Sequence, residues 1–472
     1  MKTLLLALLG MSGMWLGAPG AEEPFPPGAV VEKLSCRADP TQTYALYLPS
    51  AYDPARRWPV LILMDPRGRA LVPLELFRAA AEKRGWILMS SYDTASDGPW
   101  EPNQKAVSAM LPEAQTRHRG DSKRLYLSGF SGTARVGWEF GLQLQGRLAG
   151  LIGFGGGLPF ASSRLHSAPF PFYGAAGLFD FNHEEMRSLD EQLEAMHAAH
   201  RFESFDGPHS WGPESLCARA VDWMEIQAMK SGLKPRDTAL VEEIFSADSN
   251  RAASLESAGK LYEAFLAWRT LERDFADLKD VAQPKARRMT LEASKPVRKA
   301  QATVRSLAAG QTAYEVRLGD FLANFHTAAE PPGVARSLAY LQIALLKRRA
   351  TSAANPLDAQ AAQRLLEMTF VHLAFYEPRQ FLDQSNPARA LAMLQVAAAI
   401  RPEDPGVLYA QARAHAVAGS KERAIESLRR AVAAGMDNVA RIETDEALAS
   451  LRAEPGYLEI LERLRAAAPP GK

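Results

Sequence analysis

The chain of 472 residues has only two cysteines, no excess of either charge and no apolar run long enough to span a bilayer comfortably. The 55 basic side chains are balanced by 54 acidic ones. This balance argues against a nucleic-acid or polyanion binder, so no nucleic-acid partner is expected. Cys36 and Cys217 lie in different elements and do not make a metal site. They could form one disulfide or remain two buried thiols.

The N-terminus has the pattern of a secretory signal peptide over residues 1–21. Lys2 supplies a positive charge, and the apolar run from Leu4 to Leu16 is too short for a membrane span. Small residues at 18–20 offer a cleavage site, so the mature chain would begin near Ala21 or Glu22. We therefore expect a secreted or periplasmic protein without a transmembrane segment in its mature form. An uncleaved membrane anchor is the alternative interpretation.

Two regions of different composition meet near residue 233. Before it, short apolar runs alternate with helical stretches, which predicts an α/β domain over residues 30–232 with a mostly parallel sheet covered on both faces. After it, the sequence is rich in Ala, Leu, Arg and Glu, which predicts an all-α domain over 238–466. Strands are expected at 43–48, 59–64, 86–91, 124–128, 148–154, 172–178 and 201–205, and helices at 74–84, 103–117, 183–200 and 213–230.

The all-α region contains a repeat, which is most regular over residues 386–438. Ala390, Leu394 and Ala397 recur 34 residues later as Ala424, Leu428 and Ala431, the period of the tetratricopeptide pattern. Gly259 and Ala264 keep the spacing of Gly419 and Ala424, so a degenerate copy is expected at 259–275. Such arrays bind a protein or peptide in a concave groove, although some only pack against their own enzyme. A generic all-α domain is the alternative.

The residues from 124 to 135 carry the strongest chemical signal. An apolar strand ends in Gly129-Phe130-Ser131-Gly132-Thr133, and a helix-compatible segment follows. A strand, a tight turn and a helix are the context of a nucleophile elbow, which presents a serine hydroxyl at the edge of the sheet. The last position of this motif is Thr133 where a glycine is usual, and its branched side chain fits a tight turn less well.

A base and an orienting acid follow the serine in chain order. Asp180 and His209 each come directly after a predicted strand, which places them with Ser131 at the carboxyl edge of the sheet. Asp180 would hold the tautomer of His209, and His209 would take the proton of Ser131. The alternatives are a helix N-cap for Asp180 and an ordinary surface loop for His209, while Asp206 is a competing acid.

An oxyanion hole needs two backbone N–H donors. Gly132 is the expected first donor, and Arg67 or Gly68 the second, because Pro66 has no N–H. Three aromatic residues on loops at the same edge could line the substrate pocket or merely fill packing space: Tyr92, Trp100 and Trp211.

Together with the segments 44–49 and 59–63, these residues resemble the α/β-hydrolase family over roughly 34–230. The resemblance is to secreted esterases of the polyhydroxybutyrate-depolymerase and feruloyl-esterase type, and prolyl-oligopeptidase domains and dienelactone hydrolases share parts of it. It implies attack by Ser131 on an acyl carbonyl, with no cofactor. The sequence departs from the family at Thr133 and where Asp65-Pro66-Arg67-Gly68 replaces the usual His-Gly pair.

The sequence thus predicts a serine hydrolase acting on small or polymer-borne carboxylic esters. The short segment between the strands at 148–154 and 172–178 leaves no room for a large lid, so an open site is expected. A prolyl-oligopeptidase-like peptidase is a second hypothesis, although no propeller domain precedes the catalytic half. The third is an inactive hydrolase-fold scaffold that binds partners through its repeats, suggested by the two departures from the family pattern.

Overall fold

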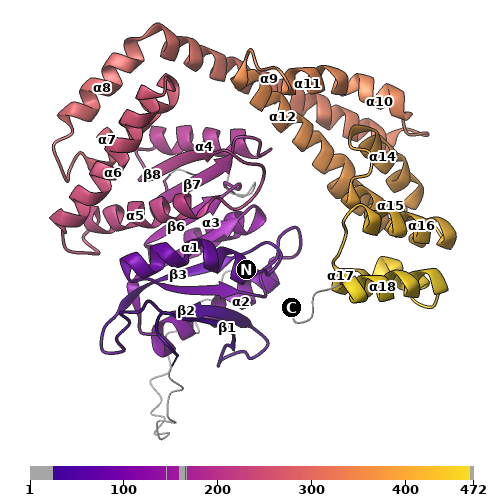
Figure 1. Cartoon of the computed structure of the whole chain (residues 1–472), viewed down its shortest axis with the longest axis horizontal. Helices are drawn as coiled ribbons and strands as arrows, with labels where there is room; N and C mark the ends of the chain where they lie inside the picture. The colour runs from indigo at the N-terminus through magenta and orange to yellow at the C-terminus, as the bar shows by residue number, and fades with distance from the viewer. Residues whose placement is uncertain (1–24, 145, 159–164, 166, 468–472) are drawn as a thin grey trace, which may run out of the picture.

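The computed structural model describes residues 25–144, 146–158, 165 and 167–467 (Figure 1). The expected signal peptide lies outside these residues. An α/β domain extends to the end of helix α5, and a curved array of helices follows. Within the described ranges, no helix combines the length and apolar character needed to cross a membrane.

The α/β domain is built on an eight-stranded sheet with the order β1-β2-β4-β3-β5-β6-β7-β8. The pairs β1–β2 and β2–β4 are antiparallel, and all others are parallel. This is the strand order of the α/β-hydrolase fold, and it confirms the expected fold class. The strands are β1 (Val30–Ser35), β2 (Thr43–Tyr47), β3 (Trp58–Met64), β4 (Ile87–Ser91), β5 (Gly120–Phe130), β6 (Gly150–Phe154), β7 (Phe172–Gly177) and β8 (His200–Phe205).

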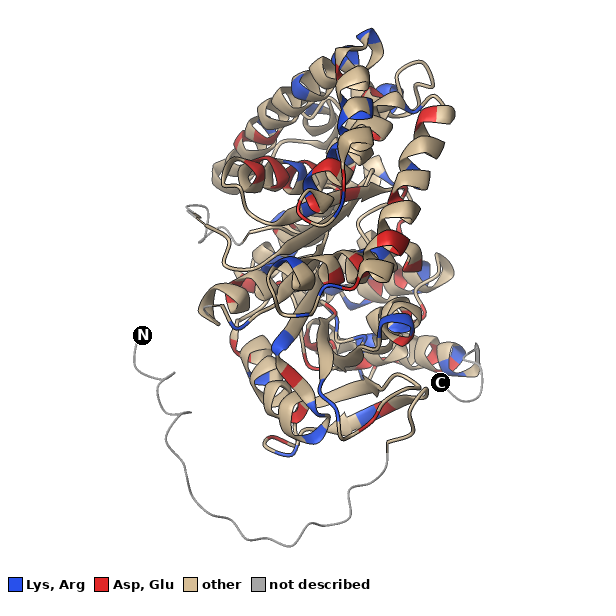
Figure 2. Ribbon diagram, turned by 90° about the vertical axis from the view of Figure 1, so that its left-hand side faces the viewer, with Lys and Arg blue, Asp and Glu red and all other residues tan. Residues whose placement is uncertain are grey.

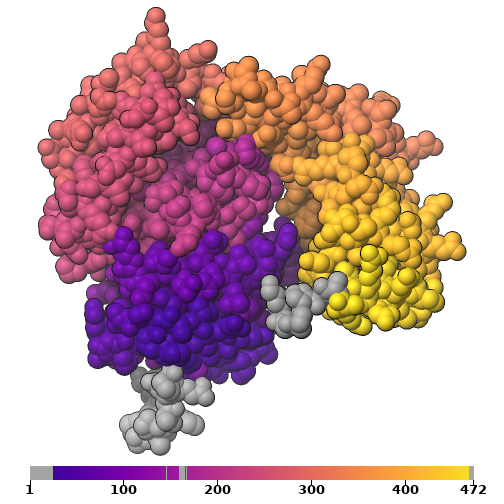
Figure 3. Space-filling model, viewed as in Figure 1, coloured from indigo at the N-terminus to yellow at the C-terminus, as the bar shows by residue number. Residues whose placement is uncertain are grey.

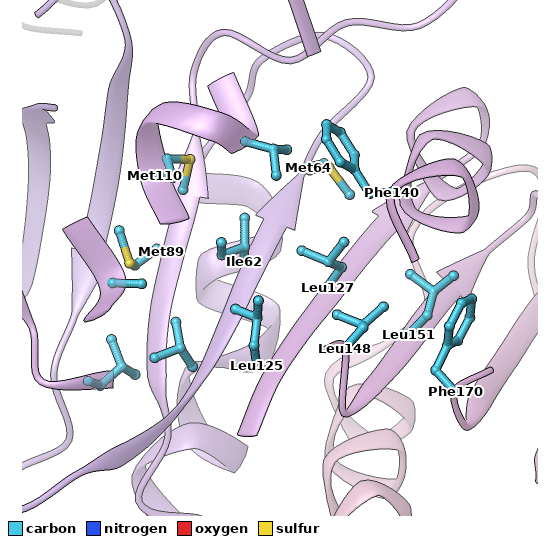
Figure 4. Packing of buried hydrophobic residues seen from close by; sticks show 14 of the residues in the cluster. Ile62, Met64, Met89, Met110, Leu125, Leu127, Phe140, Leu148, Leu151 and Phe170 are labelled. Atoms are coloured by element: carbon cyan, nitrogen blue, oxygen red, sulfur yellow. The ribbon is translucent and has the colours of Figure 1, made fainter. Parts of the chain in front are cut away.

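Buried side chains alternate between the two faces of the sheet because successive residues of a strand point in opposite directions. In β3, Val60 and Ile62 join one core, and Leu61 and Leu63 join the other. The first core is covered by α2 (Glu101–Pro112), α3 (Gly132–Gln143) and α4 (His183–Ala195), and Figure 4 shows its interdigitated side chains. The second is covered by α1 (Leu71–Arg84) and α5 (Glu214–Lys230).

Sequence patterning located these elements closely, with two differences. Strand β1 was not predicted, because its residues are only half-buried and carry little apolar signal. The helix expected at 183–200 ends at Ala195, and His200 begins β8. The helix expected at 103–117 is present as α2, followed directly by a π-helical turn over Glu113–Arg117.

The helical array consists of consecutive helices, most of them joined by short turns. Gly259 and Gly419 have positive φ values of 74° and 75° at two of these turns, a conformation in which glycine has no Cβ penalty. The repeated small and apolar side chains of α14 and α16 are fully buried where helices cross. The array comprises α6 (Thr238–Ser257), α7 (Leu261–Phe275), α8 (Ala282–Ala293), α9 (Lys295–Thr327), α10 (Val334–Tyr340), α11 (Ile343–Ala350), α12 (Pro356–Val371), the π-turn η4 (His372–Tyr376), α13 (Glu377–Asp383), α14 (Pro387–Ile400), α15 (Pro405–Val417), α16 (Lys421–Ala433), α17 (Val439–Thr444), η5 (Glu446–Leu451) and α18 (Pro455–Ala467).

The first two helices of the array are fastened to the α/β domain by buried polar contacts. Trp223 of α5 donates from Nε1 to Asp274 Oδ2 of α7 at 2.9 Å, and Arg201 of β8 binds Asp248 of α6 at 2.6 Å. From there the array arches around the sheet, so that α12 to α18 stand opposite the α/β domain (Figures 1 and 3). Acidic and basic residues are interspersed over the elements in Figure 2, in keeping with the neutral overall charge.

Candidate active site

Ser131 occupies a strained turn between β5 and α3. Its φ of 56° and ψ of −126° lie in a region that residues with a side chain rarely adopt. Two glycines make the turn feasible: a Cβ on Gly129 would lie 2.4 Å from Thr133 O, and one on Gly156 would lie 2.3 Å from Ser131 O. The sequence pattern therefore produces the elbow geometry that was expected of it.

His209 joins Ser131 and Asp180 in a continuous hydrogen-bond chain. Its Nε2 lies 2.9 Å from Ser131 Oγ, and its Nδ1 lies 2.8 Å from Asp180 Oδ1. Asp180 is fully buried, whereas the His209 side chain retains one fifth of its exposure. The structure thus brings together the three residues that the sequence singled out, each after a different strand, in the arrangement a nucleophile, base and acid require.

Residues that the sequence analysis did not single out hold the hydrogen-bonded side chains of Ser131, His209 and Asp180 in place. The backbone N–H of Asn182 donates to Asp180 Oδ1 at 2.8 Å, and the Asn182 amide donates to Gly155 O at 2.8 Å. The imidazole of His209 packs against the rings of Phe130 and Phe181, with centroids 4.6 and 4.2 Å away. These contacts fix the ring orientation on which proton transfer depends.

Thr133 turns out to suit the elbow. Its side chain is fully buried, and its hydroxyl accepts from Phe130 N–H at 3.1 Å and lies 2.6 Å from Met64 O. Since Phe130 ends β5 and Met64 ends β3, this hydroxyl ties together the two strands that flank the turn. The departure from the family motif is therefore a hydrogen-bonding residue in a site that tolerates its branch.

The loop after β3 is organised by Asp65, which is also fully buried. Its carboxylate accepts from the Arg69 guanidinium at 2.9 Å and from Trp211 Nε1 at 2.9 Å. Burial raises the pKa of Asp65, but these bonds and one from Arg67 N–H outweigh burial and hold the pKa below its usual value. Asp65 is therefore a stable internal anion at this edge of the sheet.

The geometry of this loop corrects the expectation that Arg67 or Gly68 supplies the second oxyanion donor. Arg67 N–H donates to Asp65 Oδ1 at 2.9 Å, and Gly68 N–H donates to Asp65 O at 3.1 Å, so both donors are engaged inside the loop. An aspartate two residues before an N–H commonly captures it in this way. Gly132 N–H, by contrast, has no acceptor among the described residues, and it follows Ser131 directly as an oxyanion donor should.

The three aromatic residues expected near the substrate are all occupied by protein contacts. Trp211 is only 8% exposed and packs against the rings of Phe130 and Phe154 in a tilted arrangement. Tyr92 donates its hydroxyl to Glu32 O at 2.7 Å, and Trp100 lies against Phe140 with ring centroids 4.7 Å apart. Packing, the alternative left open by the sequence, accounts for each of them.

The two cysteines are free thiols on opposite sides of the sheet. Cys36 belongs to the core under α2, α3 and α4, and Cys217 belongs to the core under α1 and α5. The sheet separates them, so the disulfide is excluded and the alternative of two buried thiols is what the structure has. Burial raises the pKa of the Cys36 thiol to about 12. Over the described ranges, no group of three His, Cys, Asp or Glu side chains could hold a metal ion.

The helical array contacts the segment that leads into the site from β7. Arg364 of α12 is buried and donates to Leu178 O at 3.0 Å, two residues before Asp180. Phe181 packs into the core of the array. Burial raises the pKa of the Tyr376 phenol, Asp97 raises it further and Arg135 lowers it, so η4 is within electrostatic reach of the segments flanking Ser131. This contact comes from a distant part of the chain, which the length of a local loop does not reveal.

No known protein family and no curated protein matches the chain. Solved structures that resemble it include S-formylglutathione hydrolase of Staphylococcus aureus, with 12% identity over 42% of this chain and 96% of that one and a TM-score of 0.34. A ferulic acid esterase has 13% identity over 42% and 97% of the two chains, with a TM-score of 0.34. An esterase of Pyrobaculum calidifontis has 12% identity over 44% and 87%, with a TM-score of 0.35.

Proposed function

We propose that the protein is a serine hydrolase that cleaves carboxylic esters through Ser131, His209 and Asp180. The observation that carries this proposal is the hydrogen-bond chain from Ser131 Oγ through both nitrogens of His209 to the buried Asp180. A serine hydroxyl is a weak nucleophile, and such a chain is what activates it.

The geometry supports a two-step reaction. Ser131 Oγ attacks the ester carbonyl carbon while its proton passes to His209 Nε2, and Gly132 N–H donates to the oxygen that becomes negative. His209 then returns the proton to the departing alcohol, which leaves an acyl-enzyme. Water, deprotonated by His209, attacks the acyl carbon, and Ser131 regains its proton as the carboxylic acid is released. Asp180 stabilises the imidazolium throughout.

The N-terminal pattern of residues 1–21 supports export as part of this proposal, so that the enzyme would meet its ester in the periplasm or outside the cell. The helices from α14 to α16 would be tetratricopeptide-like repeats. The contact of Arg364 in α12 with Leu178 O supports a role of the array beside the catalytic domain.

The proposal is tested by hydrolysis of p-nitrophenyl esters, from acetate to octanoate, by the mature protein and by Ser131→Ala. We expect Ser131-dependent release of p-nitrophenol and labelling of Ser131 by a fluorophosphonate probe. A protein that neither cleaves any ester nor reacts with the probe would be a scaffold, and the proposal would be wrong.

A further inference from the structure

A groove of about 230 Å³ lies between the α/β domain and the array. Arg67, in the loop after β3, forms one wall, and residues of α12, η4, α13, α15 and α17 form the other. Its surface is apolar where Phe370, Val371 and Ala374 line it. Figure 3 shows the molecule hollowed between the N-terminal domain and the C-terminal helices. We call this cavity the arginine groove because four arginines line it.

Four arginines line the groove against a single carboxylate. The arginines are Arg67, Arg379, Arg413 and Arg441, and the carboxylate is Asp404. Asp404 accepts the N–H of Val407 at 3.0 Å as the N-cap of α15.

Arg413 is already neutralised, because its Nε lies 2.8 Å from Asp445 Oδ2. The guanidinium of Arg441 lies 4.8 Å from the centre of the Tyr409 ring. In the part of the chain that the structure describes, Arg67, Arg379 and Arg441 have no ion-pair partner. The groove therefore presents uncompensated positive charge around an apolar floor.

The groove begins one strand away from the nucleophile. In the pairing of β3 with β5, Met64 is opposite Gly129, so Arg67 and Ser131 leave the same edge of the sheet on adjacent strands. Ser96, in the loop after β4, connects the loop that carries Arg67 to the site: its N–H donates to Pro66 O at 3.0 Å, and its side chain lies against Gly132. A ligand in the groove would thus extend toward Ser131.

We propose that the arginine groove binds the anionic arm of the ester substrate, a carboxylate carried on a short apolar chain whose ester carbonyl lies at Ser131. The inference rests on the proposed function and names its substrate class. Charge complementarity selects the carboxylate, and the apolar floor selects the chain that carries it. The volume favours such an arm over a folded partner, because it is below the range usual for drug-sized ligands.

The test compares two p-nitrophenyl esters of the same length, mono-p-nitrophenyl suberate, which ends in a carboxylate, and its neutral methyl ester. The wild-type protein should have the higher kcat/KM for the anionic ester, and the preference should shrink as salt is added. Arg441→Gln and Arg379→Gln should each lower the ratio of the two kcat/KM values about fivefold, the effect of one partly exposed ion pair. Arg305→Gln, an exposed arginine of α9 that does not line the groove, is the matched control and should leave the ratio unchanged.

Failure of this inference can be told apart from failure of the proposed function. Ser131-dependent cleavage of both esters with a ratio that the groove variants do not change would overturn the groove as a substrate site and leave the hydrolase standing. If neither ester is cleaved, titration calorimetry of monomethyl suberate into Ser131→Ala decides. Binding that Arg441→Gln weakens would support the groove as a carboxylate site, and absence of binding would overturn it.

Discussion

Trp211 Nε1 donates a hydrogen bond to Asp65 Oδ2 at 2.9 Å, and both residues are buried. Asp65 opens the loop after β3, and Trp211 lies two residues after His209, so this bond joins the loop beside Gly132 to the loop that carries the base. Without this bond the buried Asp65 carboxylate would lose one of its hydrogen-bond donors. A buried charge that lacks a donor destabilises the folded state.

We expect Trp211→Phe to lower kcat about tenfold and to reduce the free energy of unfolding by about 1.5–3 kcal/mol, the range for a hydrogen bond to a charged group. Phenylalanine keeps most of the packing against Phe130 and Phe154 but cannot donate. Trp138→Phe is the matched control, because Trp138 is also buried and its Nε1 has no hydrogen-bond partner among the described residues. Equal losses in the two variants, by urea unfolding and ester hydrolysis, would mean that only ring packing matters.

Gly155 lies against both Asp180 and His209 where the two side chains meet. Its φ is 53°, and a Cβ at this position would lie 2.6 Å from Asp180 Oδ2 and 3.1 Å from His209 Nδ1. Gly155→Ala should therefore force the acid and the base apart and lower kcat at least a hundredfold, because proton transfer requires hydrogen-bond distances. Gly146 also has a positive φ, of 82°, but a Cβ there would meet nothing within 4 Å, so Gly146→Ala is the matched control. It should lose stability through backbone strain alone and keep its kcat, and a similar kcat loss in both variants would contradict this explanation.

The local parts of this site could be predicted from the sequence, because each is a short pattern with a fixed geometric meaning. The elbow needs a strand, small residues and a serine, and the order of Ser131, Asp180 and His209 along alternating strands and helices places all three at one edge. What escaped prediction depends on contacts between distant segments. The hydrogen bonds of Asp65 to its own loop, the contact of Arg364 with Leu178 and the separation of Cys36 from Cys217 are set by tertiary packing, and no periodicity encodes them.

The Thr133 hydroxyl is expected to stabilise the elbow. Thr133→Val keeps the shape of the side chain but leaves Phe130 N–H and Met64 O without this partner, which should cost about 1–3 kcal/mol of unfolding free energy. Thr133→Ser keeps the hydroxyl and should cost less. Chemical denaturation of the three proteins checks the order. A valine variant as stable as the wild type would show that the hydroxyl is dispensable, and that only the size of the residue matters.

Arg364 links the array to the segment that leads into Asp180. Arg364→Met should remove the bond to Leu178 O, loosen the contact of Phe181 with the array and lower kcat about tenfold. Arg349→Met is the control: Arg349 pairs with Asp358 within the array at 2.7 Å and should leave kcat unchanged. Limited proteolysis gives a second readout, since only the Arg364 variant should be cleaved faster between the two parts of the chain. Unchanged kcat and proteolysis would mean that the array contacts the α/β domain without positioning the site.

The carboxylate of Glu203, where β8 contacts the array, should make the stability of the protein sensitive to acid. Burial raises the pKa of Glu203, but Arg201, Arg251 and Arg219 outweigh burial and lower the pKa to about 2. Because the pKa is depressed on folding, the carboxylate contributes stability above its unfolded pKa, and this contribution is lost as the pH falls from about 4.5 toward 2. The loss amounts to at most about 3 kcal/mol.

Urea unfolding midpoints from pH 6 to 2.5 should therefore fall steeply below pH 4.5. In Glu203→Gln the midpoint should be lower at neutral pH, since the arginines lose their counter-charge, and should depend less on pH. An equally steep fall in that variant would assign the acid sensitivity to other carboxylates.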